Sequence, residues 1–248
     1  MDDKKPIAII ALVLIAAILG GVWWYSRSTP PPANSTPQAV NATEAPIDKP
    51  APPVNLPPLD QMDAFLRPLL SALSARPELA KWLATDGLLR QLAMAINQAS
   101  AGDSPSRDFK VIAPASSFRV AGRGDKRTIL PASYTRYDGL VQTLTSIDAA
   151  AAARIYKTIR PRLNEEYQSL GNQGRNVDPA LQQALDILLD TPLVKDPVPL
   201  IETGAAGWAF EDPELEELTA TQKQLLRMGA TNVERVQAWL RAFQAAIQ

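Results

Sequence analysis

Two short polar segments hold the residues best suited to bind a ligand. In Ser133–Asp138, two tyrosines, an arginine and an aspartate open a predicted helix. Tyr134 and Tyr137 are three residues apart on the apolar face of this helix, so core packing with hydrogen-bonded hydroxyls is the default interpretation. Arg136 lies beside that face, where its planar guanidinium could clamp a carboxylate of the protein or of a ligand.

The second segment, Gln222–Asn232, begins inside a predicted helix. Gln222 takes a position in a leucine stripe that the spacing would give to an apolar residue. A buried glutamine must be fully hydrogen-bonded, so it either anchors a polar network or faces a cleft. Lys223 and Arg227 are four residues apart on a neighbouring face. The pattern favours a structural network; the alternative is a binding site formed by Tyr134, Arg136, Tyr137, Gln222, Lys223 and Arg227.

The composition excludes several kinds of catalytic and metal site. The chain has no cysteine and no histidine. Disulfides, thiol nucleophiles, histidine-dependent triads and the usual zinc sites are therefore excluded. The phosphate-binding, dinucleotide-binding and nucleophile-elbow motifs are also missing. We predict no cofactor and no metal site, since any metal would depend on carboxylates alone.

Carboxylate pairs are what remain for catalysis. Glu165-Glu166 is one pair, and an acidic group spans residues 211–217. Cleavage of a glycan needs two carboxyl groups about 5–9.5 Å apart on opposite sides of a bond, which neighbours on one helix do not provide. The acidic group also has a structural explanation, because negative charge is favoured in the first turns of a helix.

Cationic residues gather between Arg107 and Arg127 and again between Arg154 and Arg162. Such segments could contact anionic lipid, acidic glycan or nucleic acid. The balance of 25 basic against 26 acidic residues argues against nucleic acid. A solvated face is the favoured interpretation.

The first part of the chain predicts a membrane anchor and a tether. Residues 7–25 carry no charge and would reach about 28 Å as a helix, close to the hydrocarbon thickness of a bilayer. The lysines at positions 4 and 5 favour a cytoplasmic location for residues 1–6. A cleaved signal peptide is the alternative, but its apolar region should be shorter. Residues 26–58 are rich in proline and predict a disordered linker.

Residues 59–248 predict a single, mostly helical α+β domain with a small β-hairpin. The hairpin turns at Gly122–Asp125, and short extended pieces are expected at Val198–Ile201 and Trp208–Phe210. One helix is expected over residues 131–147. N-caps are expected at Asp60, Asp148, Asp178 and Asp212, and at Thr231 or Asn232 for the last helix.

Several segments of this region together resemble one known family. They are Leu56–Phe65, Trp82–Gly102, Ser133–Asp148, Pro161–Gly171 and Phe210–Asn232. Their amino-acid sequences resemble the domain of unknown function 3014 family, which comprises proteobacterial proteins with an N-terminal membrane anchor, a proline-rich linker and this one domain. The resemblance implies the inner membrane of a Gram-negative bacterium, with the domain in the periplasm. It implies no activity.

Two hypotheses about function follow. The first is a periplasmic interaction or scaffold module, tethered to the inner membrane through residues 7–25 and binding an envelope protein or a cell-wall polymer. The second is a carboxylate-dependent envelope enzyme acting on glycan. An enzyme needs a cleft with two facing carboxyl groups, whereas a binding module needs an exposed apolar or Tyr/Arg patch.

Overall fold

The computed structural model describes residues 55–104, 114, 116–124, 126–195, 197–203 and 207–248. This part of the chain is mostly helical with a small antiparallel sheet, which confirms the predicted fold class. Its helices are η2 (Leu59–Gln61), α2 (Met62–Ser71), α3 (Pro77–Leu83), α4 (Leu88–Ser100), α5 (Ala132–Thr135), α6 (Asp138–Thr145), α7 (Ala149–Ser169), α8 (Val177–Leu189), α9 (Pro213–Glu216), α10 (Ala220–Leu226) and α11 (Ala230–Ile247). Its strands are β1 (Val120–Arg123), β2 (Lys126–Ile129), β3 (Pro199–Thr203) and β4 (Gly207–Phe210).

The predicted anchor at residues 7–25 and most of the predicted linker lie outside the described residues. Among the helices that are described, none combines the length and the apolar character needed to span a membrane. Leu56 and Pro57, at the end of the predicted linker, accept hydrogen bonds from the guanidinium of Arg162 in α7, at 3.2 and 2.9 Å. The contacts of the domain therefore extend a few residues before Leu59.

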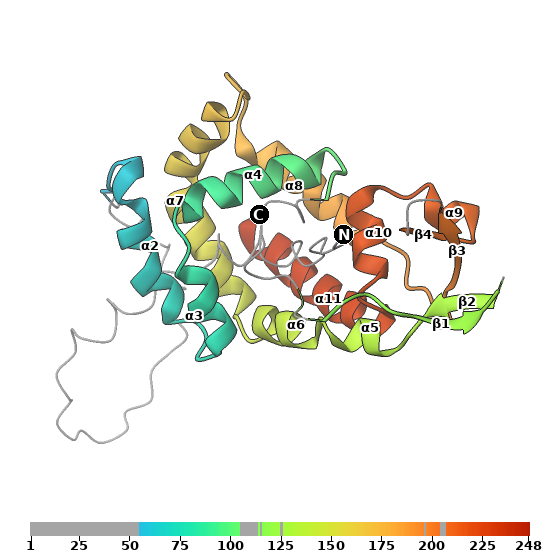
Figure 1. The fold of residues 1–248 in the computed structure, drawn as a ribbon. Helices are drawn as coiled ribbons and strands as arrows, with labels where there is room; N and C mark the ends of the chain where they lie inside the picture. The colour runs from blue at the N-terminus through green and yellow to red at the C-terminus, as the bar shows by residue number, and fades with distance from the viewer. Residues whose placement is uncertain (1–54, 105–113, 115, 125, 196, 204–206) are drawn as a thin grey trace, which may run out of the picture.

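The main core is a group of helices packed around α11, which runs through the centre of Figure 1. Helix α11 packs against α6, α7 and α8, and α4 packs across α7 and α8. The apolar face of α7 is buried in this core, as Ile155, Ile159 and Leu163 show. Trp239 of α11 stacks on Phe243 with ring centroids 5.5 Å apart, which adds a rigid aromatic layer to this core.

The sheet lies at the opposite end of the molecule from α2 and α3 (Figure 1). Its strands follow the order β1-β2-β3-β4, each antiparallel to its neighbour. The predicted hairpin is thus only half of the sheet, because β3 pairs with β2 through Arg127 and Leu200. A second, smaller core joins this sheet to the helices; it contains Ile129, Tyr134, Val198, Leu200, Phe210, Leu215 and Leu226.

Of the predicted N-caps, those at Asp148 and Asp212 are confirmed, whereas those at Asp60, at Asp178 and at Thr231 or Asn232 are wrong. Asp148 accepts a hydrogen bond from Ala151 N at 2.6 Å, and Asp212 accepts one from Glu214 N at 2.9 Å. Asp60 lies inside the short helix η2, so it caps nothing. Asp178 lies in the first turn of α8, which begins one residue earlier at Val177, and its carboxylate instead accepts a hydrogen bond from the hydroxyl of Tyr156.

Three helix boundaries also differ from the predictions. The helix expected over residues 131–147 is divided into α5 and α6. The leucine stripe that includes Gln222 is divided between α9 and α10. Helix α11 starts after Gly229, so Asn232 lies inside it, and its amide donates a hydrogen bond to Asp138 at 2.9 Å. At each of these boundaries, side chains from elements distant in the sequence pack together. The periodicity of apolar residues within one segment cannot predict such contacts.

Candidate functional site

Two regions contain the polar side chains that could bind a ligand. The first is the arginine cluster, formed by Arg136, Tyr137, Gln224 and Arg227. The division between α5 and α6 places Arg136 and Tyr137 next to α10, which carries Gln224 and leads into Arg227. The cluster therefore contains three of the residues predicted from sequence.

Tyr137 is at the centre of the arginine cluster and is 0% exposed. Its hydroxyl accepts hydrogen bonds from Arg136 Nη2 at 2.8 Å and from Gln224 Nε2 at 3.2 Å. Burial raises the pKa of Tyr137, while the charges of Arg136 and Arg227 and the two hydrogen bonds act in the opposite direction. The net shift is upward, so the hydroxyl stays protonated at neutral pH.

Arg136 is held to the fold by several contacts. Its Nε donates to the backbone oxygen of Ser133 at 2.9 Å, and its Nη1 donates to that of Ser116 at 3.2 Å. The guanidinium carbon lies 5.4 Å from the ring centroid of Phe118 and 4.7 Å from that of Tyr137. These distances are typical of cation–π contacts.

Arg227 has fewer contacts with the fold. Its Nη2 donates to the backbone oxygen of Trp208 at 3.1 Å, and its guanidinium carbon lies 5.5 Å from the ring centroid of Phe210. Burial lowers the pKa of Arg227, and the charge of Arg136 lowers it further, while Tyr137 and Glu216 oppose these effects. Among the ion pairs of the described residues, none includes Arg136 or Arg227.

The other predicted site residues serve local structure. Gln222 and Thr219 form a capping box, in which Gln222 Oε1 accepts from Thr219 N and Thr219 Oγ1 accepts from Gln222 N, both at 3.2 Å. This arrangement agrees with the network interpretation of Gln222. Lys223 Nζ donates to Glu216 Oε1 at 2.8 Å. Tyr134 packs its ring against Gly229, where an added Cβ would lie 2.8 Å from the ring.

The carboxylate pairs considered from the sequence are engaged elsewhere. Glu165 accepts from Arg162 at 2.7 Å, and Glu166 accepts from Arg90 at 2.7 Å. Glu216, in the acidic group, also accepts from the backbone nitrogen of Phe210. Burial would raise the pKa of Glu216, but its contacts with Lys223 and with that backbone nitrogen outweigh burial, and the pKa is lowered. These contacts do not place two carboxyl groups on opposite sides of a position that a glycosidic bond could occupy.

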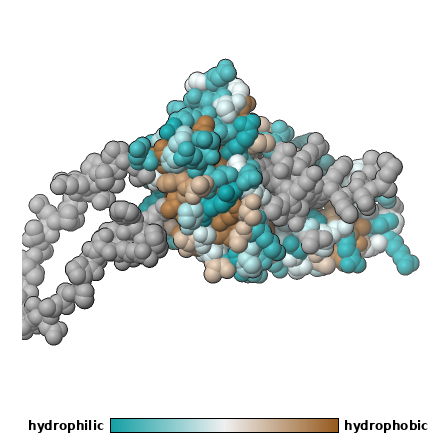
Figure 2. Space-filling model, turned by 60° about the vertical axis from the view of Figure 1, so that its left-hand side comes forward, coloured by the Kyte–Doolittle hydropathy of each residue, from teal (hydrophilic) through white to brown (hydrophobic). Residues whose placement is uncertain are grey.

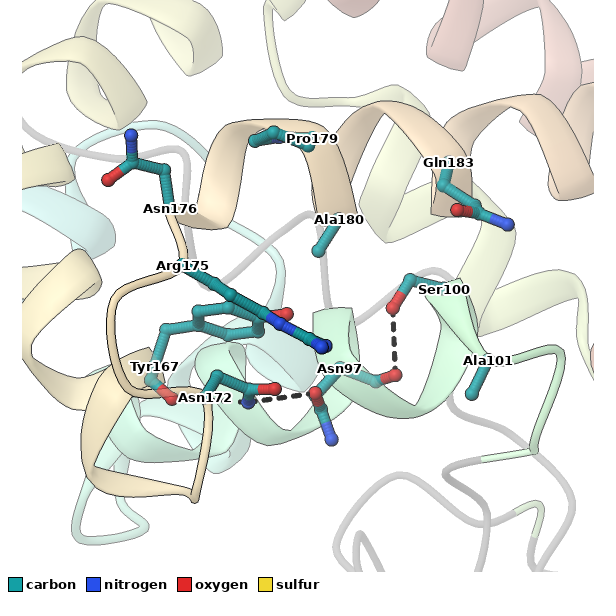
Figure 3. A pocket seen from close by; sticks show the side chains of 10 residues that line it. All are labelled: Asn97, Ser100, Ala101, Tyr167, Asn172, Arg175, Asn176, Pro179, Ala180 and Gln183. Atoms are coloured by element: carbon teal, nitrogen blue, oxygen red, sulfur yellow. Dashed lines mark hydrogen bonds between the residues drawn. The ribbon is translucent and has the colours of Figure 1, made fainter.

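The second region is the amide pocket, a depression of about 550 Å³ between α4, the loop that joins α7 to α8, and α8. The loop projects from the molecule, and on the face seen in Figure 2 this projecting end is mainly hydrophilic. No Asp or Glu is among the described residues that line the pocket. Its polar lining consists of Asn97, Ser100, Tyr167, Asn172, Arg175, Asn176 and Gln183 (Figure 3).

Hydrogen bonds hold one side of the amide pocket in place. Asn172 Nδ2 donates to Asn97 Oδ1 at 3.0 Å and to the backbone oxygen of Tyr167 at 3.2 Å. Ser100 Oγ donates to the backbone oxygen of Asn97 at 2.9 Å. Arg175 extends across the Tyr167 ring toward Asn97 (Figure 3). Its guanidinium forms no ion pair with a described residue, so it is available to a ligand.

No pattern in the sequence predicted the amide pocket. Asn97 and Asn172 are 75 residues apart in the chain, and neither lies in a recognisable motif. The only sequence signal is the density of amide residues at the two ends of the α7–α8 loop. Groups of three or more acidic residues that could hold a metal ion are absent from the described part of the chain.

The comparisons with known proteins identify a family. No curated protein and no solved structure matches the chain. A family described as a protein of unknown function (DUF3014) matches residues 88–244, which is more than half of the chain and includes every residue of the arginine cluster and the amide pocket. The resemblance stated from the sequence is confirmed: the chain belongs to the DUF3014 family.

Proposed function

We propose that the protein is an interaction module of the bacterial cell envelope. In this proposal, residues 7–25 anchor the chain in the inner membrane, with residues 1–6 in the cytoplasm. The proline-rich linker then holds the helical domain in the periplasm. The length and the charge-free character of residues 7–25 support the anchor, and the neighbouring lysines support its orientation.

The amide pocket carries the binding function. Side-chain amides both donate and accept hydrogen bonds, so the pair Asn97 and Asn172 suits a ligand rich in hydroxyl and acetamido groups. Pro179 and Ala180 provide apolar lining, and Arg175 provides a charge for a carboxylate. A volume of about 550 Å³ fits the usual size of a small-ligand site. These features favour a cell-wall glycan that carries carboxylates.

Binding is favoured over cleavage by the composition of this pocket. The described residues that line it include no Asp or Glu, so the pocket itself offers no acid and base pair. The pairs with Arg162 and Arg90 occupy Glu165 and Glu166, the other carboxylates considered for an envelope enzyme. We therefore place the enzyme hypothesis second.

The proposal is tested by calorimetric titration of the full chain, in a neutral detergent, with the disaccharide of N-acetylglucosamine and N-acetylmuramic acid. We expect saturable binding, weakened roughly tenfold by Asn172→Ala, since one hydrogen bond of about 1.4 kcal/mol corresponds to that factor. Gln183→Ala should also weaken binding, whereas the matched control Gln182→Ala, at the neighbouring position outside the pocket, should not. Heat signals that never saturate, or equal effects of the two glutamine variants, would contradict the proposal.

A further inference from the structure

The sheet has a buried face and an outer face. Side chains alternate between the two faces along a strand. Leu200 of β3 and Phe210 of β4 are opposite each other in the register, and both are buried in the smaller core. The residues that alternate with this buried set form the outer face, which consists of Arg119, Ala121, Arg123, Lys126, Thr128, Pro199, Ile201, Thr203 and Ala209.

The outer face combines free cations with apolar side chains. Arg119, Arg123 and Lys126 are exposed, and none of them forms an ion pair with a described residue. The register of β2 and β3 places Lys126 opposite Ile201, which is 48% exposed. The described residues of the four strands contribute no carboxylate to this face. Glu211, which follows β4, is at the edge of the sheet far from β1.

The cation on the other face of β2 is used by the fold. The guanidinium carbon of Arg127 lies 5.4 Å from the ring centroid of Trp208, and its Nε donates to the backbone oxygen of Gly124 at 3.3 Å. Contacts of this kind are not present for the three outer cations among the described residues. The outer face therefore suits a partner that supplies both negative charge and an apolar medium for Ile201.

We propose that the outer face of the sheet docks on the surface of an anionic lipid bilayer. In the docked state, Arg119, Arg123 and Lys126 contact the headgroup phosphates, while Ile201 enters the boundary between headgroups and acyl chains. The hairpin of β1 and β2 projects from the end of the molecule (Figure 1). Nucleic acid supplies the negative charge but no apolar medium, so lipid is the better match.

This inference rests on the proposed membrane anchor, which supplies the bilayer. Residues 26–54, at about 3.1 Å each, can extend to roughly 90 Å, which exceeds the diameter of roughly 40 Å expected for a domain of this size. The sheet can therefore reach the membrane although it lies at the opposite end of the molecule from α2. Tethering also raises the effective concentration of the bilayer, so a weak contact is sufficient.

The test labels a single introduced cysteine, since the natural chain has none. Ile201→Cys in the full chain carries the dye NBD, whose emission rises and shifts to the blue in lipid. The chain is compared in nanodiscs of phosphatidylcholine and of phosphatidylglycerol. We expect emission at least about twofold higher in the anionic lipid, reversed by concentrated sodium chloride. Gln173→Cys, at an exposed position of the α7–α8 loop, is the matched label and should not distinguish the lipids.

A charge variant tests the role of the cations. Lys126→Gln should lower the ratio of docked to undocked chain about fivefold, since each basic residue near an anionic surface contributes roughly this factor. The control Lys157→Gln removes the same charge from an exposed position on α7 and should leave the ratio unchanged.

Failure of the anchor and failure of the docking are distinguishable. A chain that does not remain with the nanodiscs contradicts the anchor, and the labelled chain is then titrated with phosphatidylglycerol vesicles to test docking alone. The docking proposal is overturned if the label at position 201 responds equally to the two lipids, which would leave the outer face to an acidic protein. It is also overturned if the Lys126 and Lys157 variants behave alike.

Discussion

The arginine cluster and the amide pocket are built from the same kinds of side chain, yet these side chains do different things for the fold. In the arginine cluster, the hydroxyl of the fully buried Tyr137 accepts hydrogen bonds from a neighbouring arginine and from another helix. In the amide pocket, Tyr167 is also buried, at 5% exposure, but its hydroxyl has no hydrogen bond to a described residue, and Arg175 is exposed. In the first region the tyrosine hydroxyl is bonded to the fold, whereas in the second the tyrosine ring is part of the main core and the arginine lies at the surface.

This contrast between the two regions separates the structural effect of a substitution from its effect on binding. A substitution in the arginine cluster leaves buried donors or charges without partners, so it should lower the free energy of unfolding. A substitution in the amide pocket exposes its polar groups to water, so it should change binding and leave stability nearly constant. Paired substitutions of the same type, one in or beside each region, test this contrast directly.

The largest contrast is expected between two glycines. Gly229, beside the ring of Tyr134, has φ +80 and ψ 153, a conformation that is nearly confined to glycine, and an added Cβ would lie 2.8 Å from that ring. Gly174, in the loop beside the amide pocket, has φ +74 and open space around the added atom. Gly229→Ala should destabilise the protein by about 3 kcal/mol or more, and Gly174→Ala by about 1 kcal/mol.

Urea denaturation of the full chain, followed by tryptophan fluorescence, measures both values. If the two glycine variants lose equal free energy of unfolding, the packing around Gly229 is no tighter than the packing around Gly174, and the contrast is wrong.

A smaller contrast is expected between two tyrosines. Tyr137→Phe removes the hydroxyl that accepts from Arg136 and Gln224 and should lower the free energy of unfolding by about 1–3 kcal/mol, because two hydrogen bonds in a largely buried region are lost. Tyr167→Phe removes a hydroxyl that bonds to no described residue and should change it by less than about 0.5 kcal/mol. Thermal unfolding of the two variants is the measurement. A larger loss of stability for Tyr167→Phe than for Tyr137→Phe would contradict the structural role given to the Tyr137 hydroxyl.

The smallest effect concerns pH and is confined to the edge of the arginine cluster. The pKa of Glu216 is lowered below its ordinary value of 4.5, so its interactions stabilise the fold above about pH 4.5. That contribution is lost as the pH falls through the lowered pKa of the folded state. Because the carboxylate is partly exposed, we expect only about 0.5 kcal/mol.

Glu216→Gln should therefore be less stable than the natural chain at neutral pH and equal to it in acid. Urea denaturation at several pH values measures this difference. Glu217→Gln, at an exposed neighbour, is the control and should show no such dependence. A gap between Glu216→Gln and the natural chain that persists in acid would mean that Glu216 acts through packing instead.

Much of the helical fold could be predicted because its signals are local. The stripe of Ile155, Ile159 and Leu163 and the cap at Asp148 lie within a few turns of one helix. The breaks between helices could not be predicted in the same way. The segment of residues 131–147 reads as one helix, but Tyr137 is buried against α10 at the point where it breaks. That contact joins residues 87 positions apart.

The candidate sites show the same limit. Arg136, Tyr137 and Arg227 stood out because charged and aromatic residues lie on or beside apolar helix faces, and the structure places Tyr137 against α10, which leads into Arg227. Asn97 and Asn172 did not stand out, because isolated amides are ordinary on a helical surface. Only the packing of α4 against α7 and α8 makes them neighbours.

By itself, the sequence determined what chemistry this protein lacks and which faces its helices bury. Without cysteine and histidine, thiol and imidazole chemistry is excluded, and apolar residues at helical spacing specify the core. The tertiary structure alone decided which polar side chains meet, because their meeting depends on packing between elements far apart in the chain. It placed Arg136 against the ring of Tyr137 and Arg227 against that of Phe210, and it left Arg175 exposed at the amide pocket.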